Sequence, residues 1–281
     1  MGETLLITGG RRSRARWWAV AALAVLVPGG AAADMRSDFI SGVSRDCPGC
    51  DLAGFSAKRG DLSGANLAGA NLRGANFHDA KLAGVNLSGA DLTRANLNKA
   101  DLARANLSGA KLQGAMLYAA RLDLANVSKA DLTGAYMGTA RMTRANFSLA
   151  LLARVDLRRA RMPEANFSGC DLSEIWLDGA QMRGANLAGS RMEKASMNGA
   201  ELADVDLSGA DLTESDMLQA NLRGADLSRA NLSHVNLRQA TITQAKFDGA
   251  TYLETMMPDG TVLPLSPSSP GGGQQQDLQP R

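Results

Sequence analysis

The chain has 281 residues, with 30 Lys or Arg against 28 Asp or Glu, so its formal net charge is only +2. A balance this close to neutral excludes both a strongly basic polyanion binder and a strongly acidic mimic at the level of the whole chain. Aromatic residues make up 4% of the sequence, so a core has to be built from aliphatic side chains.

Residues 1–33 have the parts of an export signal. Four arginines precede an apolar run from Trp17 to Val27, and Ala31-Ala32-Ala33 follows a Pro-Gly-Gly break. The run is too short to span a ~30 Å hydrocarbon layer. We therefore expect a cleavable signal peptide, a mature protein that begins at Asp34 without a membrane anchor, and a secreted, periplasmic location. Arg11-Arg12 leaves the twin-arginine route open beside general secretion.

Residues 34–49 are expected to cap the structure that follows. Phe39 and Ile40 supply an apolar surface, and Cys47-Pro48-Gly49-Cys50 is a C-x-x-C motif. In an oxidising compartment this spacing predicts a Cys47–Cys50 disulfide. Thiol redox catalysis would need a βαβ unit around the pair, and a zinc site would need two further ligands. Neither is present nearby, and Cys170 is expected to be a buried free thiol.

Residues 50–252 repeat with a period of five. All 41 positions from Leu52 to Tyr252 at this spacing are apolar, 26 of them Leu, and the residue two before is Ala in 30 cases. The residue directly before the large one is Asp or Asn in 24 cases. A period of five fits neither an α-helix nor a flat strand. Since one unit cannot bury its own Leu, we expect an all-β solenoid in which stacked units bury each other's side chains.

The repeat resembles that of the pentapeptide repeat family, A-(D/N)-L-x-x, in segments such as Ala65-Asn66-Leu67-Ala68-Gly69 and Ala70-Asn71-Leu72-Arg73-Gly74. The resemblance implies a right-handed quadrilateral β-helix with four pentapeptides per coil, which gives about ten coils here. It implies no reaction, because most members have no established activity. The best understood members bind DNA gyrase by imitating DNA.

Residues 253–281 leave the repeat. A strand and turn at the start of this segment are expected to cap the open end of the solenoid, because exposed coil edges need cover. The remainder is rich in Pro, Ser, Gly and Gln and is expected to be a disordered tail.

The outward positions supply the candidate interaction surface. With twenty residues per coil, an aromatic column and a neighbouring arginine column are expected on adjacent faces. Large or basic side chains at outward positions are the kind that form interaction hot spots, although stacked long side chains can also simply shield coil edges. The candidate residues are Met116, Tyr118, Arg121, Tyr136, Arg141, Arg144, Arg158, Arg159, Arg161 and Trp176.

We therefore expect a non-catalytic scaffold that binds an unidentified protein. A first alternative is an envelope-binding module whose basic and aromatic faces engage an anionic polymer or lipid headgroups. A second is a topoisomerase-binding DNA mimic, which export would place on the wrong side of the membrane. No enzyme, metal, cofactor or nucleic-acid partner is expected, because the two histidines, His78 and His234, lie far apart along the repeat and no cleft is predicted.

Overall fold

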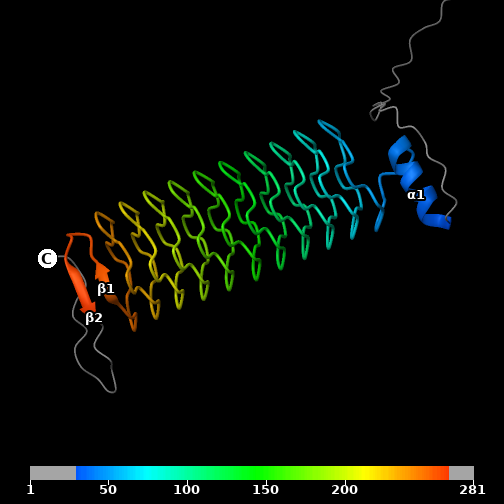
Figure 1. Cartoon of the computed structure of the whole chain (residues 1–281). Coiled ribbons are helices and arrows are strands. Elements are labelled where there is room, and N and C mark those ends of the chain that lie inside the picture. Colours follow the sequence, from blue (N-terminus) through cyan, green and yellow to red (C-terminus); the bar gives the residue numbers. More distant parts are fainter. Residues whose placement is uncertain (1–29, 266–281) are drawn as a thin grey trace, which may run out of the picture.

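The computed structural model of the protein describes residues 30–265, most of which form an elongated rod of stacked coils (Figure 1). Helix α1, Gly30–Ser41, lies at one end of the rod. The predicted cleavage junction after Ala33 falls inside α1, and the rest of the predicted signal peptide lies outside the described residues. Within the described part of the chain, no helix has the length and apolar character needed to cross a bilayer.

Each coil of the rod takes twenty residues. Isolated parallel bridges join residues twenty apart, from Asp51 with Asn71 through to Asn236 with Met256. One coil therefore consists of four pentapeptides, and the rod has four faces, each formed by one pentapeptide per coil. We call the residue directly before the large apolar residue the bridge residue. The two residues directly after the large apolar residue are called the turn residues. The large and small apolar positions are called slots.

Backbone hydrogen bonds connect each coil to its two neighbours. The Leu72 N–H donates to the Asp91 carbonyl at 2.7 Å, and the Asn71 N–H donates to the Cys50 carbonyl at 2.9 Å. Within a pentapeptide, the Ala75 N–H donates to the Leu72 carbonyl at 3.0 Å and closes the turn. This repeated pattern satisfies the backbone of the coils without long strands.

The interior is filled by side chains from both slots. Leu, Met and Phe in the large slots and Ala in the small slots are almost entirely buried, as predicted. The rings of Phe147 and Phe167, on successive coils, stack with centroids 4.8 Å apart. Cys170 is a buried free thiol in a small slot, as expected. Ser190 and Ser215 are also buried there, and their hydroxyls have no hydrogen-bond partner among the described residues.

The second turn residue of each pentapeptide adopts the left-handed conformation. Gly109 has φ 64° there, which glycine tolerates without steric cost. Leu149 occupies the same position with φ 59°, and its side chain is 59% exposed. Twenty-four non-glycine residues of the described chain have positive φ. The coil geometry thus overrides the local preference of these residues against left-handed backbone.

At the N-terminal end the Cys47–Cys50 disulfide is present, as predicted. The coils begin one pentapeptide earlier than expected, since Cys47 takes a large slot and its N–H donates to the Asn66 carbonyl at 2.8 Å. Helix α1 covers this end through Phe39, which is 2% exposed. The ring centroid of Phe39 lies 5.4 Å from that of Phe55.

At the other end, strands β1, Leu253–Met256, and β2, Val262–Leu265, pair as an antiparallel hairpin. The repeat was predicted to end at Tyr252, but it continues further. Thr255 fills a further small slot and Met257 a further large one. The Thr255 hydroxyl donates to the Leu232 carbonyl at 2.6 Å. The tail predicted to be disordered, residues 266–281, lies outside the described residues.

Candidate interaction surface

An aromatic column lies along one face of the rod. Bridges join Met116 to Tyr136, Tyr136 to Asp156, and Asp156 to Trp176, and these four residues are named the aromatic column. Tyr136 is 57% exposed and Trp176 is 45% exposed. Because neighbouring strands lie ~4.8 Å apart, the backbones of these two residues are separated by about 10 Å. The column therefore presents large apolar surface on a backbone fixed by hydrogen bonds.

Tyr118 widens this surface from a turn position on the same face. Its N–H donates to Asn98 Oδ1 at 2.8 Å, and its side chain is 53% exposed. The ring lies beside Gly138 of the next coil, where an added Cβ would be 3.5 Å from Tyr118 Cδ2. Gly138 was not among the predicted surface residues, because its only signal in the sequence is the lack of a side chain between Tyr118 and Arg158 in the same turn position.

Asp156 separates the two exposed aromatic residues of the column and binds Arg158. The Arg158 Nε donates to Asp156 Oδ1 at 2.9 Å, and Nη2 donates to Oδ2 at 2.7 Å. These hydrogen bonds lower the pKa of Asp156 and raise that of Arg158. The predicted surface residue Arg158 is therefore held by an acidic neighbour and is not a free cation.

The adjacent face carries the arginine column, defined as Arg121, Arg141 and Arg161, which bridges join in that order. Arg121 Nη1 lies 3.3 Å from Asp101 Oδ2. Asp123 Oδ2 lies 3.9 Å from Arg121 Nε and 4.0 Å from Arg141 Nε. Arg161 has no acidic partner among the described residues. Charge compensation therefore decreases along the column.

Two further predicted cations lie near the arginine column. The Arg144 Nε donates to Glu164 Oε2 at 2.6 Å, and this contact lowers the pKa of Glu164. Arg159, which occupies the turn between the aromatic and arginine faces, has no acidic partner in the described part of the chain. Of the predicted arginines, only Arg159 and Arg161 are thus left without a carboxylate.

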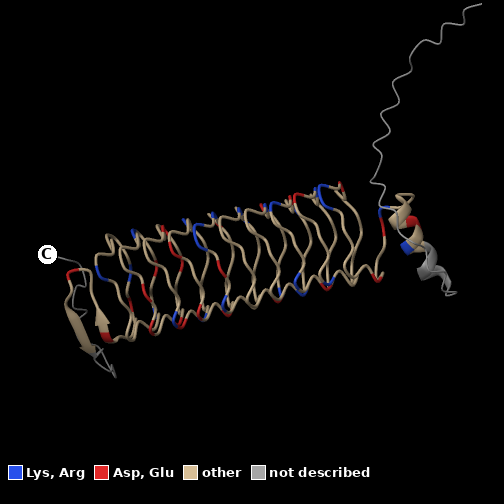
Figure 2. Cartoon of the chain, turned by 45° about the horizontal axis from the view of Figure 1, so that its top comes forward, with Lys and Arg blue, Asp and Glu red and all other residues tan. Residues whose placement is uncertain are grey.

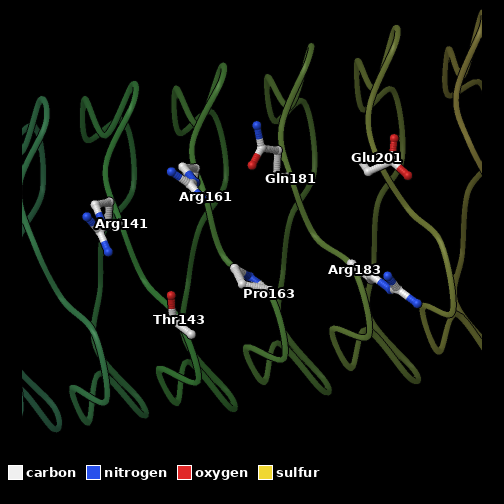
Figure 3. Close-up of a pocket in the computed structure, with 7 residues that line it drawn as sticks. All are labelled: Arg141, Thr143, Arg161, Pro163, Gln181, Arg183 and Glu201. Carbon is white, nitrogen blue, oxygen red and sulfur yellow. The ribbon is translucent and has the colours of Figure 1, made fainter.

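A shallow hollow of about 230 Å³ lies beside the arginine column (Figure 3). Arg141, Arg161, Gln181 and Glu201 follow one another along successive coils on one side of it, while Thr143, Pro163 and Arg183 form the other row. A second hollow on the same face is lined by two arginines, one carboxylate and apolar or small residues, namely Arg104, Arg121, Asp123, Leu124, Ala83, Gly84 and Ala103. Both hollows are thus lined by arginine.

Acidic and basic residues alternate along much of the rod (Figure 2). Among residues 30–265, no group of three His, Cys, Asp or Glu side chains is placed to hold a metal ion. His234 Nδ1 lies 3.4 Å from Glu254 Oε2, an exposed contact near the C-terminal hairpin. His78 lies near the opposite end of the repeat. The histidines are therefore not brought together.

The twenty-residue coil, the paired slots and the outward columns define a solenoid of five-residue repeats whose exterior is available for contacts. The chain belongs to the pentapeptide repeat family, because the model of pentapeptide repeats matches residues 61–98, 100–138, 140–179, 180–219 and 215–251. Proteins of this family form right-handed quadrilateral β-helices. They are generally structural or interaction proteins without catalytic activity.

Several solved structures are similar to the chain. HetL, a pentapeptide repeat protein involved in heterocyst differentiation regulation in the cyanobacterium Nostoc, is 31% identical, with 81% of this chain and 98% of HetL covered and a TM-score of 0.37. QnrB1, a plasmid-mediated fluoroquinolone resistance protein, is 17% identical, with 69% and 91% covered and a TM-score of 0.37. A pentapeptide repeat protein from the thylakoid lumen of Arabidopsis thaliana is 24% identical, with 38% and 66% covered and a TM-score of 0.21. No curated protein matches the sequence.

Proposed function

We propose that this protein is a secreted, non-catalytic scaffold that binds a protein partner through the aromatic column and Tyr118. The observation that carries this proposal is the exposure of Tyr136 and Trp176 on one face of a hydrogen-bonded rod. Tyr and Trp are enriched in binding hot spots because they bury much area with few rotatable bonds. A rigid scaffold also loses little conformational entropy when it binds.

The opposite face of the rod provides an internal contrast. Its bridge residues include Asn86, Asn106 and Asn126, whose side-chain amides donate to the Asn of the preceding coil at 3.0, 3.2 and 3.4 Å. These side chains satisfy one another, and Ser follows in many of the neighbouring turn positions. Between Asn86 and Asn126 this face carries neither aromatic nor charged side chains, so this stretch is expected to be inert.

Site-specific photocrosslinking tests the aromatic contact. A photoreactive residue at position 176 is expected to capture a partner in the native compartment, whereas the same residue at Asn146, a bridge position on the opposite face, is not. Capture from position 176 should be lost when Tyr136 is changed to Ala. Equal capture from both positions, or capture that survives Tyr136→Ala, would contradict the proposal.

Secretion is a separate part of the proposal and is supported by the charge and hydropathy pattern of residues 1–33. Cell fractionation with N-terminal sequencing tests it. We expect a mature chain that begins at Asp34 outside the cytoplasm. An intact N-terminus in the cytoplasm would reject secretion and leave the aromatic contact to be judged by crosslinking.

A further inference from the structure

Basic bridge residues follow a charge rule elsewhere in the rod. Outside the arginine column, each basic bridge residue is joined to an acidic bridge residue on the preceding coil. Where it also forms a bridge to the following coil, that partner is acidic too. The sets are Asp61-Lys81-Asp101, Asp91-Lys111-Asp131, Asp171-Arg191-Asp211 and Asp226-Lys246. The arginine column breaks this rule, because Arg121, Arg141 and Arg161 follow one another directly.

This exception has an electrostatic cost. The column places like charges on strands ~4.8 Å apart, and like charges directly opposite one another destabilise a sheet. Asp123 is shared between Arg121 and Arg141 at 3.9 and 4.0 Å, and Arg161 has no carboxylate partner among the described residues. Simple duplication of a coil does not account for the column, because the residue two after each arginine differs: Asp123, Thr143 and Pro163.

The shape of the same face fits an elongated ligand. The hollow lined by Arg141, Arg161 and Arg183 (Figure 3) lies on the same face as the hollow lined by Arg104 and Arg121, and successive members of the arginine column line the two hollows. In the second row of the hollow, Thr143 and Pro163 have shorter side chains than Arg183, which follows them on the next coil. Glu201 ends the basic lining on the C-terminal side. The arginine face therefore carries two shallow hollows that follow one another along the arginine column.

The excess of arginine over carboxylate on this face favours an anionic ligand, and guanidinium groups suit phosphate. A guanidinium group presents a planar fork of donors that matches phosphate oxygens. An extended peptide repeats its same-side carboxylates every ~6.6 Å, which does not match the ~4.8 Å spacing of the coils. A linear phosphate polymer carries charge on every unit and so meets each guanidinium without a fixed register.

We propose that the arginine face binds inorganic polyphosphate, which lies along the rod over Arg121, Arg141 and Arg161. This site is separate from the aromatic column and goes beyond the proposed protein contact. The ligand supplies the counter-charges that the acidic bridge residues supply elsewhere in the rod. Binding is expected to weaken steeply with salt, because the charges are exposed and screened in solution.

Fluorescence anisotropy with labelled long-chain inorganic polyphosphate and the purified mature chain tests the proposal. The double variant Arg141→Gln/Arg161→Gln should weaken binding at least about tenfold. The matched control Lys111→Gln/Arg191→Gln removes the same charge from bridge positions flanked by Asp and should change the affinity less than about twofold. Equal losses in both variants, or no binding at low salt, would overturn the proposal.

Competition distinguishes the ligand class. Unlabelled polyphosphate should displace the probe, whereas orthophosphate at the same phosphate concentration should not, because it cannot span the column. Poly-glutamate, single-stranded DNA or anionic lipid vesicles that bind as tightly as polyphosphate would replace the proposed ligand with another class and so reject it.

Folding and the two surfaces are checked separately. The Arg141→Gln/Arg161→Gln variant should melt no lower than the unsubstituted protein, because the exchange removes like-charge repulsion. Trp176→Ala should leave polyphosphate affinity unchanged while it abolishes the protein contact. If Trp176→Ala weakens polyphosphate binding as much as the arginine variant does, the arginine face is not a distinct site.

Discussion

The Arg158 side chain holds Asp156 through two hydrogen bonds, from Nε to Oδ1 at 2.9 Å and from Nη2 to Oδ2 at 2.7 Å, and the Arg158 backbone N–H adds a third to Oδ1 at 3.1 Å. We expect Asp156→Asn to lower the free energy of unfolding by about 0.5–1 kcal/mol at neutral pH, since Arg158 is largely exposed and solvent screens the pair. Chemical denaturation checks this value. Asp216→Asn, on the same face without an arginine partner among the described residues, should cost less.

The Asp156 pair also gives a pH dependence of known sign. The Arg158 hydrogen bonds lower the pKa of the Asp156 carboxyl in the folded protein. The pair therefore stabilises the fold above the ordinary pKa value of 3.8. This stabilisation is lost as the pH falls through the lower folded pKa. The difference in stability between the unsubstituted protein and Asp156→Asn should therefore shrink in acid. A difference that grows below pH 3.8 would contradict this assignment.

Ser190 and Ser215 should be replaceable with a gain in stability. Their buried hydroxyls lack partners among the described residues, and Ala is the usual residue of the small slot. Each Ser→Ala exchange is expected to raise the free energy of unfolding by about 1 kcal/mol. Thr255→Val is the matched opposite case, because its hydroxyl donates to the Leu232 carbonyl at 2.6 Å. If both kinds of exchange destabilise to the same degree, the serine hydroxyls have partners in solution.

Cys170 should make the protein less stable in alkali. Burial raises the pKa of its thiol from 9.0 to about 11. Because the folded pKa is raised, the stabilisation is complete below pH 9.0 and is lost as the pH rises toward about 11. A shift of this size corresponds to about 3 kcal/mol. Denaturation of Cys170→Ala beside the unsubstituted protein isolates this contribution from other titrating groups, and parallel stability profiles would contradict it.

Reduction of the Cys47–Cys50 disulfide should destabilise the first coil. The bond closes a loop of only a few residues, so the expected loss is about 2 kcal/mol. Because each coil contacts only its neighbours, the loss should first appear as proteolytic cleavage near α1. Reductant should have no effect on Cys47→Ala/Cys50→Ala. Unchanged proteolysis of the unsubstituted protein after complete reduction would show that α1 and Phe39 suffice to hold this end.

The interior could be predicted from the sequence because large and small apolar side chains recur at a fixed spacing of five residues, and the twenty-residue coil was implied by the resemblance to the pentapeptide repeat family. The two ends could not be placed as well. Cys47 fills a large slot although its side chain is small, and a disulfide joins it to Cys50 in the small slot that follows. At the other end, the repeat continues to Met257 with the polar Thr255 in a small slot. The Thr255 hydroxyl donates to the Leu232 carbonyl, a contact that residue type alone does not reveal.

The columns of the surface could also be located by counting twenty residues along the chain. The sequence does not tell which cations are free, because that depends on side-chain geometry between coils. Arg144 pairs with Glu164 of the next coil and Arg158 with Asp156 of its own, whereas Arg161 pairs with neither kind of neighbour. The space that Gly138 leaves for the Tyr118 ring likewise appears only when adjacent coils are superposed.

The coil length has a consequence for how such a chain can change in length. Loss or gain of twenty residues shortens or lengthens the rod and keeps every downstream side chain on its face. Loss or gain of a single pentapeptide preserves the core equally well but turns everything beyond it by one face. A five-residue deletion between Tyr136 and Trp176 would thus leave a folded rod whose two aromatic side chains point in different directions.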